Sequence, residues 1–126
     1  MFEADIDWKV KHISIAETAD AFVVAPATAN IIAKFACGIA DDAMSTLILA
    51  LSCPIIICPA MNSQMYKNTI TQNNITALKK LGYIFIGPET GALASGGIDS
   101  IGRLAEPQKI VAEIKKLFAI SNKDEK

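Results

Sequence analysis

The sequence predicts an α/β protein with a parallel sheet and flanking helices. Short apolar runs at residues 21–24, 54–58 and 83–86 alternate with longer segments of helical character. The runs are continuously apolar, as strands buried on both faces of a parallel sheet are. Hydrophobic residues make up 52% of the 126 residues and charged residues only 20%, which fits one domain with a large core.

The first expected strand and helix lie close together. Residues 13–19 suggest one or two helical turns, and residues 21–24 read as a buried strand that ends at Ala-Pro. Thr28 can cap a helix over residues 29–36, because its hydroxyl can accept a backbone N–H of the first turn. Gly38 marks the end of that helix.

The middle of the chain repeats this alternation. A second helix is expected over residues 41–51, and the strand at residues 54–58 follows it. A third helix over residues 71–81 ends at Gly82, and the next strand occupies residues 83–86. Sequential strands joined by helices are typical of a parallel sheet.

The C-terminal third divides into a loop, a helix and a tail. Residues 87–103 are rich in glycine and are not expected to be regular throughout. Pro107 opens a last helix to about Phe118, as proline does at a first helical turn. The domain is therefore expected to span residues 1–118, followed by a charged, flexible tail over residues 119–126.

Composition excludes several classes of function. A net charge of −1 lacks the excess of basic residues that is typical of nucleic-acid-binding proteins. No apolar run reaches the roughly 18 residues of a membrane span. The N-terminus has no signal-peptide core, so a cytoplasmic protein is expected. Cys37, Cys53 and Cys58 form no CxxC pair and are expected to be reduced and buried. With a single histidine, no metal cofactor is expected.

The stretch PIIICPAMN at residues 54–62 carries the first functional signal. An apolar strand ends abruptly in small and polar residues. In parallel sheets, ligands bind in the crevice beyond the carboxyl ends of the strands. Asn62 is placed to contact such a ligand. Alternatively, Asn62 caps a helix and Met65 belongs to the core.

Other polar residues also have two interpretations. An imidazole titrates near neutrality, which suits His12 as a general base, but spacing alone favours a partly exposed histidine that caps a short helix. Asp41 and Asp42 form a pair of carboxylates, for which helix-dipole and surface roles are favoured.

Taken in order, the motifs resemble one family. The chain contains His12-Ile13, Ala19-Asp20, APATANIIAKFACGIADD, PAMN with Met65, LASGG and GRLAEP. This series resembles the flavin-dependent cysteine decarboxylases, in particular those that act on phosphopantothenoylcysteine, and the resemblance covers residues 10–118. The flavin prenyltransferases share the broad pattern, but PAMN is not expected in them.

The resemblance implies a Rossmann-like (flavodoxin-like) fold and an FMN-dependent reaction. The reaction decarboxylates 4'-phosphopantothenoylcysteine to 4'-phosphopantetheine in coenzyme A biosynthesis. Oxidation of the substrate thiol to a thioaldehyde creates the electron sink for decarboxylation, and an enethiolate results. The flavin carries this chemistry, while the protein binds, orients and protonates.

The resemblance also implies roles for particular residues. His12 is the expected base, Asn62 hydrogen-bonds the substrate carboxylate, and Ser95 stands where the family has a cysteine that acts as an acid. The flavin-contacting residues implied are Thr28, Ala29, Asn30, Ile31, Ala60 and Met61. The substrate-binding residues implied are Asn62, Met65, Leu93 and Ala94, the last two on a clamp loop within residues 87–103.

The chain departs from the family at two places that bear on function. The family begins with a strand and a Gly-rich turn that holds the flavin phosphate, and nothing before His12 corresponds to them. A separate polypeptide could supply that segment. The clamp loop reads Leu-Ala-Ser-Gly instead of Leu-Ala-Cys-Gly, and the segment between it and Gly102 is a residue longer than usual.

Three activities and an assembly follow as expectations. The first activity is the phosphopantothenoylcysteine decarboxylase reaction, and the second is an oxidative cysteine decarboxylation that stops at the enethiol. The third is a non-catalytic, flavin-binding or regulatory half-flavoprotein. The family builds its flavin site where subunits meet, so a homo-oligomer is expected, as a trimer or a multiple of trimers.

Overall fold

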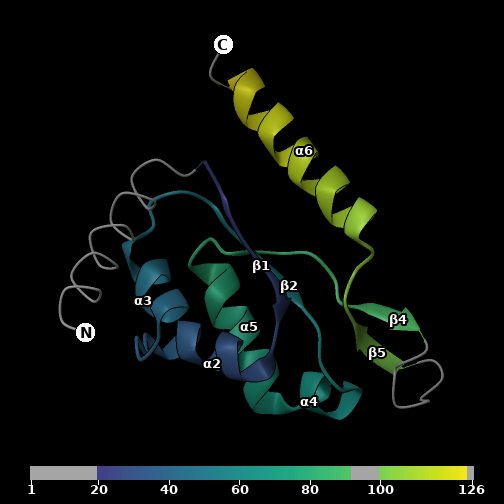
Figure 1. The fold of residues 1–126 in the computed structure, drawn as a ribbon. Helices are drawn as coiled ribbons and strands as arrows, with labels where there is room; N and C mark the ends of the chain where they lie inside the picture. Colours follow the sequence, from purple (N-terminus) through teal and green to yellow (C-terminus); the bar gives the residue numbers. More distant parts are fainter. Residues whose placement is uncertain (1–19, 92–99, 125–126) are drawn as a thin grey trace.

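The computed structural model describes residues 20–91 and 100–124 as a parallel sheet with helices on both faces (Figure 1). The sheet has the order β1–β2–β3, with β1 at Phe22–Ala27, β2 at Ile55–Pro59 and β3 at Ile84–Phe85. Both neighbouring pairs are parallel. The predicted fold class is therefore confirmed.

The helices and a hairpin complete the described chain. Two short antiparallel strands form the hairpin, β4 (Glu89–Gly91) and β5 (Ser100–Arg103). The helices are α2 (Ala29–Cys37), α3 (Ala43–Ala50), α4 (Ser63–Lys67), α5 (Thr69–Lys80) and α6 (Pro107–Asp124). None of the helices in these ranges is long and apolar enough to cross a membrane.

Two apolar clusters lie on the two faces of the sheet. Successive side chains of a strand point to opposite faces, and every residue of β2 is buried. Ile55 and Ile57 of β2 join the cluster under α2, α3 and α5, whereas Ile56 and Cys58 join the one under α6. Figure 1 shows α6 apart from the other helices. β2 is thus the central strand on which both layers pack.

The strand β1 forms one side of the described sheet. It pairs with β2, and within residues 20–91 and 100–124 no strand pairs with its other side. Val24 is buried in the cluster under α2, but Val23, which points to the opposite face, is 39% exposed. The described part of β1 therefore presents an open hydrogen-bonding edge beside an apolar side chain.

Most predicted elements are present, but several boundaries were wrong. β1 continues to Ala27, beyond the predicted end at residue 24. The predicted third helix is preceded by a separate short helix, because the side chain of Asn68 accepts the backbone N–H of Ile70 at 2.9 Å and starts α5 there. The hairpin strands of residues 87–103 were not predicted individually.

The last helix is longer than predicted. Ile114 and Leu117 pack against the cluster under α6, and the backbone stays helical to Asp124. The predicted helix end at Phe118 is therefore too early, and the expected tail over residues 119–126 overlaps the helix. Helical propensity continues through this segment, which contains no glycine or proline to stop it.

Candidate functional site

Two turns lie side by side at the carboxyl end of the sheet. Ala27 ends β1 opposite Pro59, which ends β2, and the backbone N–H of Ala60 donates to the carbonyl oxygen of Ala27 at 3.0 Å. The chain then turns into α2 after β1 and into α4 after β2. Parallel strands bring such turns to one edge, where ligands bind in sheets of this kind.

Thr28 begins α2 as the sequence predicts. Its backbone is extended (φ −81°, ψ 165°), and its hydroxyl accepts the N–H of Ile31 at 3.2 Å. The first N–H groups of a helix have no partner within the helix. In the part of the chain that the structure describes, those of Ala29 and Asn30 find no acceptor. The turn therefore offers two backbone donors to a polar ligand.

The predicted flavin contacts differ in burial. Asn30 is exposed, whereas Ile31 packs against the apolar cluster under α2, as Met61 does after β2. Ala29 and Ala60 are half-buried and small, so their backbones can be approached closely. The structure brings the Thr28–Ile31 turn and the Ala60–Met61 turn together, which is what a shared flavin contact requires.

Asn62 caps α4 with its side-chain oxygen. The oxygen Oδ1 accepts the backbone N–H of Gln64 at 2.8 Å, and the residue is exposed. The helix-capping interpretation is therefore correct, and it is compatible with ligand binding. Because the oxygen is occupied, the side-chain NH₂ group is the part that can donate to a ligand.

Met65 does not belong to the core. It is 49% exposed on α4, a helix that buries none of its residues. The alternative that made Met65 an ordinary core residue is thus wrong. Tyr66 of the same short helix packs against the apolar cluster under α2, whereas Met65 is left largely uncovered.

A residue of the hairpin also reaches this site. The backbone N–H of Met61 donates to the carbonyl oxygen of Gly102 at 2.8 Å, and α4 lies beside β5 (Figure 1). Sequence reasoning assigned Gly102 only to a flexible clamp. The GRLAEP motif was a signal that this segment matters, but a contact between such distant residues depends on the tertiary fold.

Asp41 and Asp42 form a structural cluster around one cation. The Lys34 ammonium lies 2.9 Å from Asp41 and 3.0 Å from Asp42. These hydrogen bonds, with Asp41 contributing most, raise the pKa of Lys34. The backbone N–H and hydroxyl of Ser45, together with Lys34, lower the pKa of Asp42 from 3.8 to about 2. Asp42 is the N-cap of α3, which supports the favoured helix-dipole and surface roles over acid–base chemistry.

The cysteines only partly match their prediction. All three are free thiols, and burial raises the pKa of Cys58. Cys37 is exposed, however, and Cys53 is half-buried, so the expectation that all three are buried was wrong. Cys37 is the last residue of α2 and lies where that helix leaves the core. Among the described residues, no group of three or more histidine, cysteine or acidic side chains could hold a metal.

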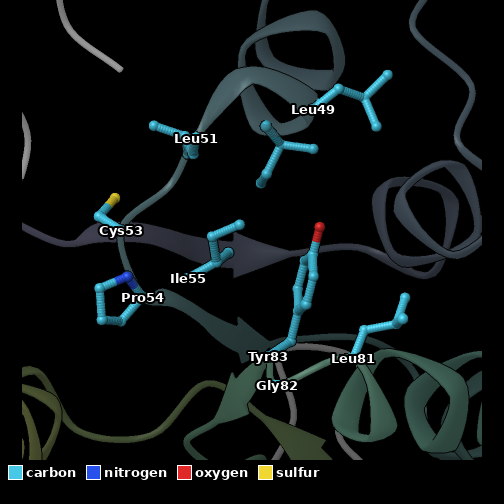
Figure 2. A pocket seen from close by; sticks show the side chains of 9 residues that line it. Leu49, Leu51, Cys53, Pro54, Ile55, Leu81, Gly82 and Tyr83 are labelled. Carbon is cyan, nitrogen blue, oxygen red and sulfur yellow. The ribbon is translucent and has the colours of Figure 1, made fainter. Parts of the chain in front are cut away.

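A cavity of about 350 Å³ lies at the opposite end of the sheet (Figure 2). Its walls come from α3, the start of β2 and the segment before β3, and they include Leu49, Cys53 and Tyr83. The hydroxyl of Tyr83 points into it, and burial raises the pKa of this tyrosine. Because it lies at the amino ends of β2 and β3, this cavity is separate from the candidate site.

Four predicted site residues lie outside the described ranges. They are His12, Leu93, Ala94 and Ser95. The described half of the candidate site therefore consists of the Thr28 turn, the Asn62 turn with Met65, and Gly102. This arrangement can bind a planar or anionic ligand through backbone donors and orient a second group through the Asn62 amide.

Comparison with known proteins places these features in a wider group. The model of the Flavoprotein family matches residues 3–119. The coenzyme A biosynthesis bifunctional protein CoaBC of Vibrio cholerae is 46% identical over 108 residues, which cover 86% of this chain but 27% of that protein. The chain thus spans about a quarter of the length of this relative.

Two solved structures are also similar. One is a cysteine-to-serine mutant of a PPC decarboxylase complexed with pantothenoylaminoethenethiol, at 34% identity and a TM-score of 0.82. The other is the FMN binding protein AtHal3, at 33% identity and a TM-score of 0.77. The matches cover 86% of this chain in both cases, and 60% and 59% of those chains.

Proposed function

Because the chain belongs to the Flavoprotein family, we propose that it takes part in FMN-dependent decarboxylation of 4'-phosphopantothenoylcysteine to 4'-phosphopantetheine. The observation that carries this proposal is the pairing of the Thr28 turn with the Asn62 turn through the Ala27–Ala60 hydrogen bond. One turn suits a flavin and the other suits a substrate carboxylate. Their proximity would place both molecules at one edge of the sheet.

The described residues fit an FMN group in part. The N–H groups of Ala29 and Asn30 and the small Ala60 would hold the ring and its polar edge, since donors at a helix start bind polar or anionic ligands. The phosphate needs donors of its own, and the described residues do not include the family's Gly-rich turn. We propose that a strand–turn–helix segment, in the same or a separate polypeptide, supplies them with its strand on the outer edge of β1.

The residues of this chain then have distinct tasks. When bound, FMN would supply the hydride acceptor for oxidation of the substrate thiol to a thioaldehyde, and this electron sink would allow the carboxylate to leave. The Asn62 amide would hold that carboxylate by donating to it without adding charge. Met65, exposed on α4, would cover the cysteine portion of the substrate.

His12 and the clamp would complete the site. His12 would accept the thiol proton as a general base near neutral pH. Leu93 and Ala94 would cover the substrate, and closure of the clamp would exclude water from a reactive intermediate. Because His12, Leu93 and Ala94 lie outside the described residues, the support for their roles is the motif order of the sequence.

A second candidate function is supported by Ser95. A serine hydroxyl is a far weaker acid than a thiol, whose pKa is about 8.5. The similar PPC decarboxylase mutant also replaces a cysteine by serine, and it holds an enethiol. If Ser95 stands at the corresponding point, the reaction would release carbon dioxide and stop at the enethiol, with the flavin reduced.

We propose that the chain assembles as a homotrimer, or a multiple of trimers, in the cytoplasm. A shared flavin site between subunits would cover apolar side chains that the described chain leaves exposed, among them Val23 and Met65. Free cysteines suit a reducing compartment. Sedimentation at micromolar concentration tests the assembly, and a stable folded monomer would contradict it.

The decisive experiment for the function is product analysis with a flavin titration. The chain is mixed with FMN and 4'-phosphopantothenoylcysteine, with and without a complementary strand–turn–helix segment, and the products are weighed by mass spectrometry. Loss of carbon dioxide supports a decarboxylase, and a product two hydrogens lighter than the thiol supports the enethiol alternative. Flavin binding without turnover, in the presence of the segment, would favour a non-catalytic role.

The same titration tests whether the complementary segment supplies the donors for the FMN phosphate. FMN binding, followed by quenching of flavin fluorescence, should be weak for this chain alone and tighter with the segment. Tight binding by the isolated chain would show that the segment is dispensable.

A further inference from the structure

Gly102 holds the Asn62 turn in a way that no other residue type allows. Its φ is +139°, a backbone region that residues with a side chain rarely adopt. A Cβ atom at this position would collide with the carbonyl oxygen of Met61 and lie 3.2 Å from its carbonyl carbon. The residue is buried, so the turn cannot easily move aside.

The contact is a directed hydrogen bond as well as a close approach. The Met61 N–H donates to the Gly102 carbonyl oxygen at 2.8 Å, and the preceding N–H, of Ala60, donates to Ala27 at 3.0 Å. The turn is therefore held from two sides, by β1 and by β5. Asn62 follows directly, and its own oxygen is tied to Gln64.

The strand β5 is itself anchored. It pairs with β4, and the carboxylate of Glu89 on β4 accepts the backbone N–H of Glu106 at 2.9 Å, just before α6. Ala105 and Ile110 then bury this end of α6 against the sheet. Gly102 thus connects the turn that carries Asn62 to a framework made by β4, β5 and α6.

We propose that Gly102 is a positioning residue that sets where the Asn62 amide meets the substrate carboxylate. This inference rests on the proposed function, because it assigns Asn62 to that carboxylate. A side chain at position 102 would push the Met61 carbonyl away and break the Met61 N–H bond. The NH₂ group of Asn62 would then be displaced, although Asn62 itself is unchanged.

The test uses Gly102→Ala with Gly82→Ala as its matched control. Gly82 also has a positive φ (+97°), but a Cβ there meets nothing within 4 Å, and the residue lies at the far end of the sheet. Both variants carry backbone strain, and only Gly102→Ala adds the collision. We expect kcat/KM for decarboxylation to fall about tenfold or more in Gly102→Ala, mainly because KM rises. A tenfold fall corresponds to a loss of about 1.36 kcal/mol in transition-state stabilisation. Gly82→Ala should keep the wild-type kcat/KM.

A double-mutant cycle shows whether Gly102 acts through Asn62. If it does, the effect of Gly102→Ala should largely vanish in an Asn62→Ala background, because coupled residues are not additive. Losses that multiply in the double variant would overturn the proposal. Wild-type kcat/KM in Gly102→Ala, or an equal loss in Gly82→Ala, would overturn it too.

Hydrogen exchange tests the contact without any turnover. In the unaltered chain, the Met61 amide should exchange at the rate set by opening of the β4–β5 hairpin, alongside the paired amides of β5. If the Met61 amide exchanges at a rate that does not depend on opening of the β4–β5 hairpin, the proposal is contradicted. This result can be obtained even if Gly102→Ala does not fold. Absence of decarboxylation by the unaltered chain, with FMN and the complementary segment present, would instead refute the proposed function and leave this measurement valid.

Discussion

The backbone N–H of Ala60 donates a 3.0 Å hydrogen bond to the carbonyl oxygen of Ala27, where the two central turns of the candidate site leave the sheet. This bond extends the parallel pairing of β1 and β2 by one step beyond Pro59. The turn after β1 and the turn after β2 are therefore joined directly by a backbone hydrogen bond.

Replacing Asn62 by aspartate should weaken productive substrate binding but preserve α4. Aspartate caps a helix about as well as asparagine, so the bond to the Gln64 N–H can persist. A carboxylate cannot donate to the substrate carboxylate and would repel it. We expect kcat/KM to fall by about 10- to 100-fold or more, since hydrogen bonds to charged groups contribute roughly 1.5–3 kcal/mol. Steady-state kinetics and circular dichroism together check this, and unchanged kcat/KM would remove Asn62 from substrate binding.

His12→Asn should abolish turnover and leave flavin binding nearly intact. An amide can keep some hydrogen bonds, but it cannot accept a proton at neutral pH. General base catalysis is typically worth 10²–10⁴-fold. Single-turnover reduction of FMN by substrate provides the measurement. Activity within about threefold of the parent, well below that range, would exclude His12 as the base.

Ser95→Cys should change the product more than the rate of carbon dioxide release. A thiol can protonate the reduced intermediate, which the serine hydroxyl does poorly. Under the enethiol alternative, the unaltered chain should yield the enethiol, and the variant should yield some of the saturated thiol. Mass spectrometry distinguishes the two by two hydrogens. If the unaltered chain forms only the saturated thiol, then Ser95 does not limit protonation of the intermediate.

Asp42 should make the free energy of unfolding depend on pH between about 2 and 3.8. Its folded pKa is about 2, below the ordinary value of 3.8, so its contribution is complete above 3.8 and is lost as pH falls toward 2. Asp42→Asn keeps a capping oxygen but does not titrate. The Tm of the parent should therefore fall more steeply than that of Asp42→Asn between these values. Parallel Tm curves would contradict the assigned role of the Asp42 charge.

The sequence was most informative where a local signal decides the structure. Thr28 and Gly38 bound α2 as predicted, because a hydroxyl cap and a left-handed glycine (φ 71°) act on their immediate neighbours. The apolar run at residues 54–58 likewise predicted β2. For the candidate site, the family resemblance implied that the Thr28 turn and the Ala60–Met61 turn contact one flavin, and the structure places these two turns side by side.

Features that depend on distant residues could not be predicted in this way. The Met61–Gly102 hydrogen bond joins residues whose proximity is created only by the hairpin and α6. The break between α4 and α5 depends on Asn68 capping the second helix, although the sequence around it is compatible with one continuous helix. The exposure of Cys37 and Met65 likewise depends on which side of a helix the core covers.

The open side of β1 creates a competition between two outcomes. Among the described residues, only β2 pairs with β1, and an exposed strand edge is a template for aggregation as well as for folding. The exposed Val23 would favour either partner. Recovery of the protein should thus depend on which strand reaches β1 first during synthesis. Co-expression with the cognate segment should increase the soluble yield, whereas addition of that segment after purification would come too late for chains already joined edge to edge.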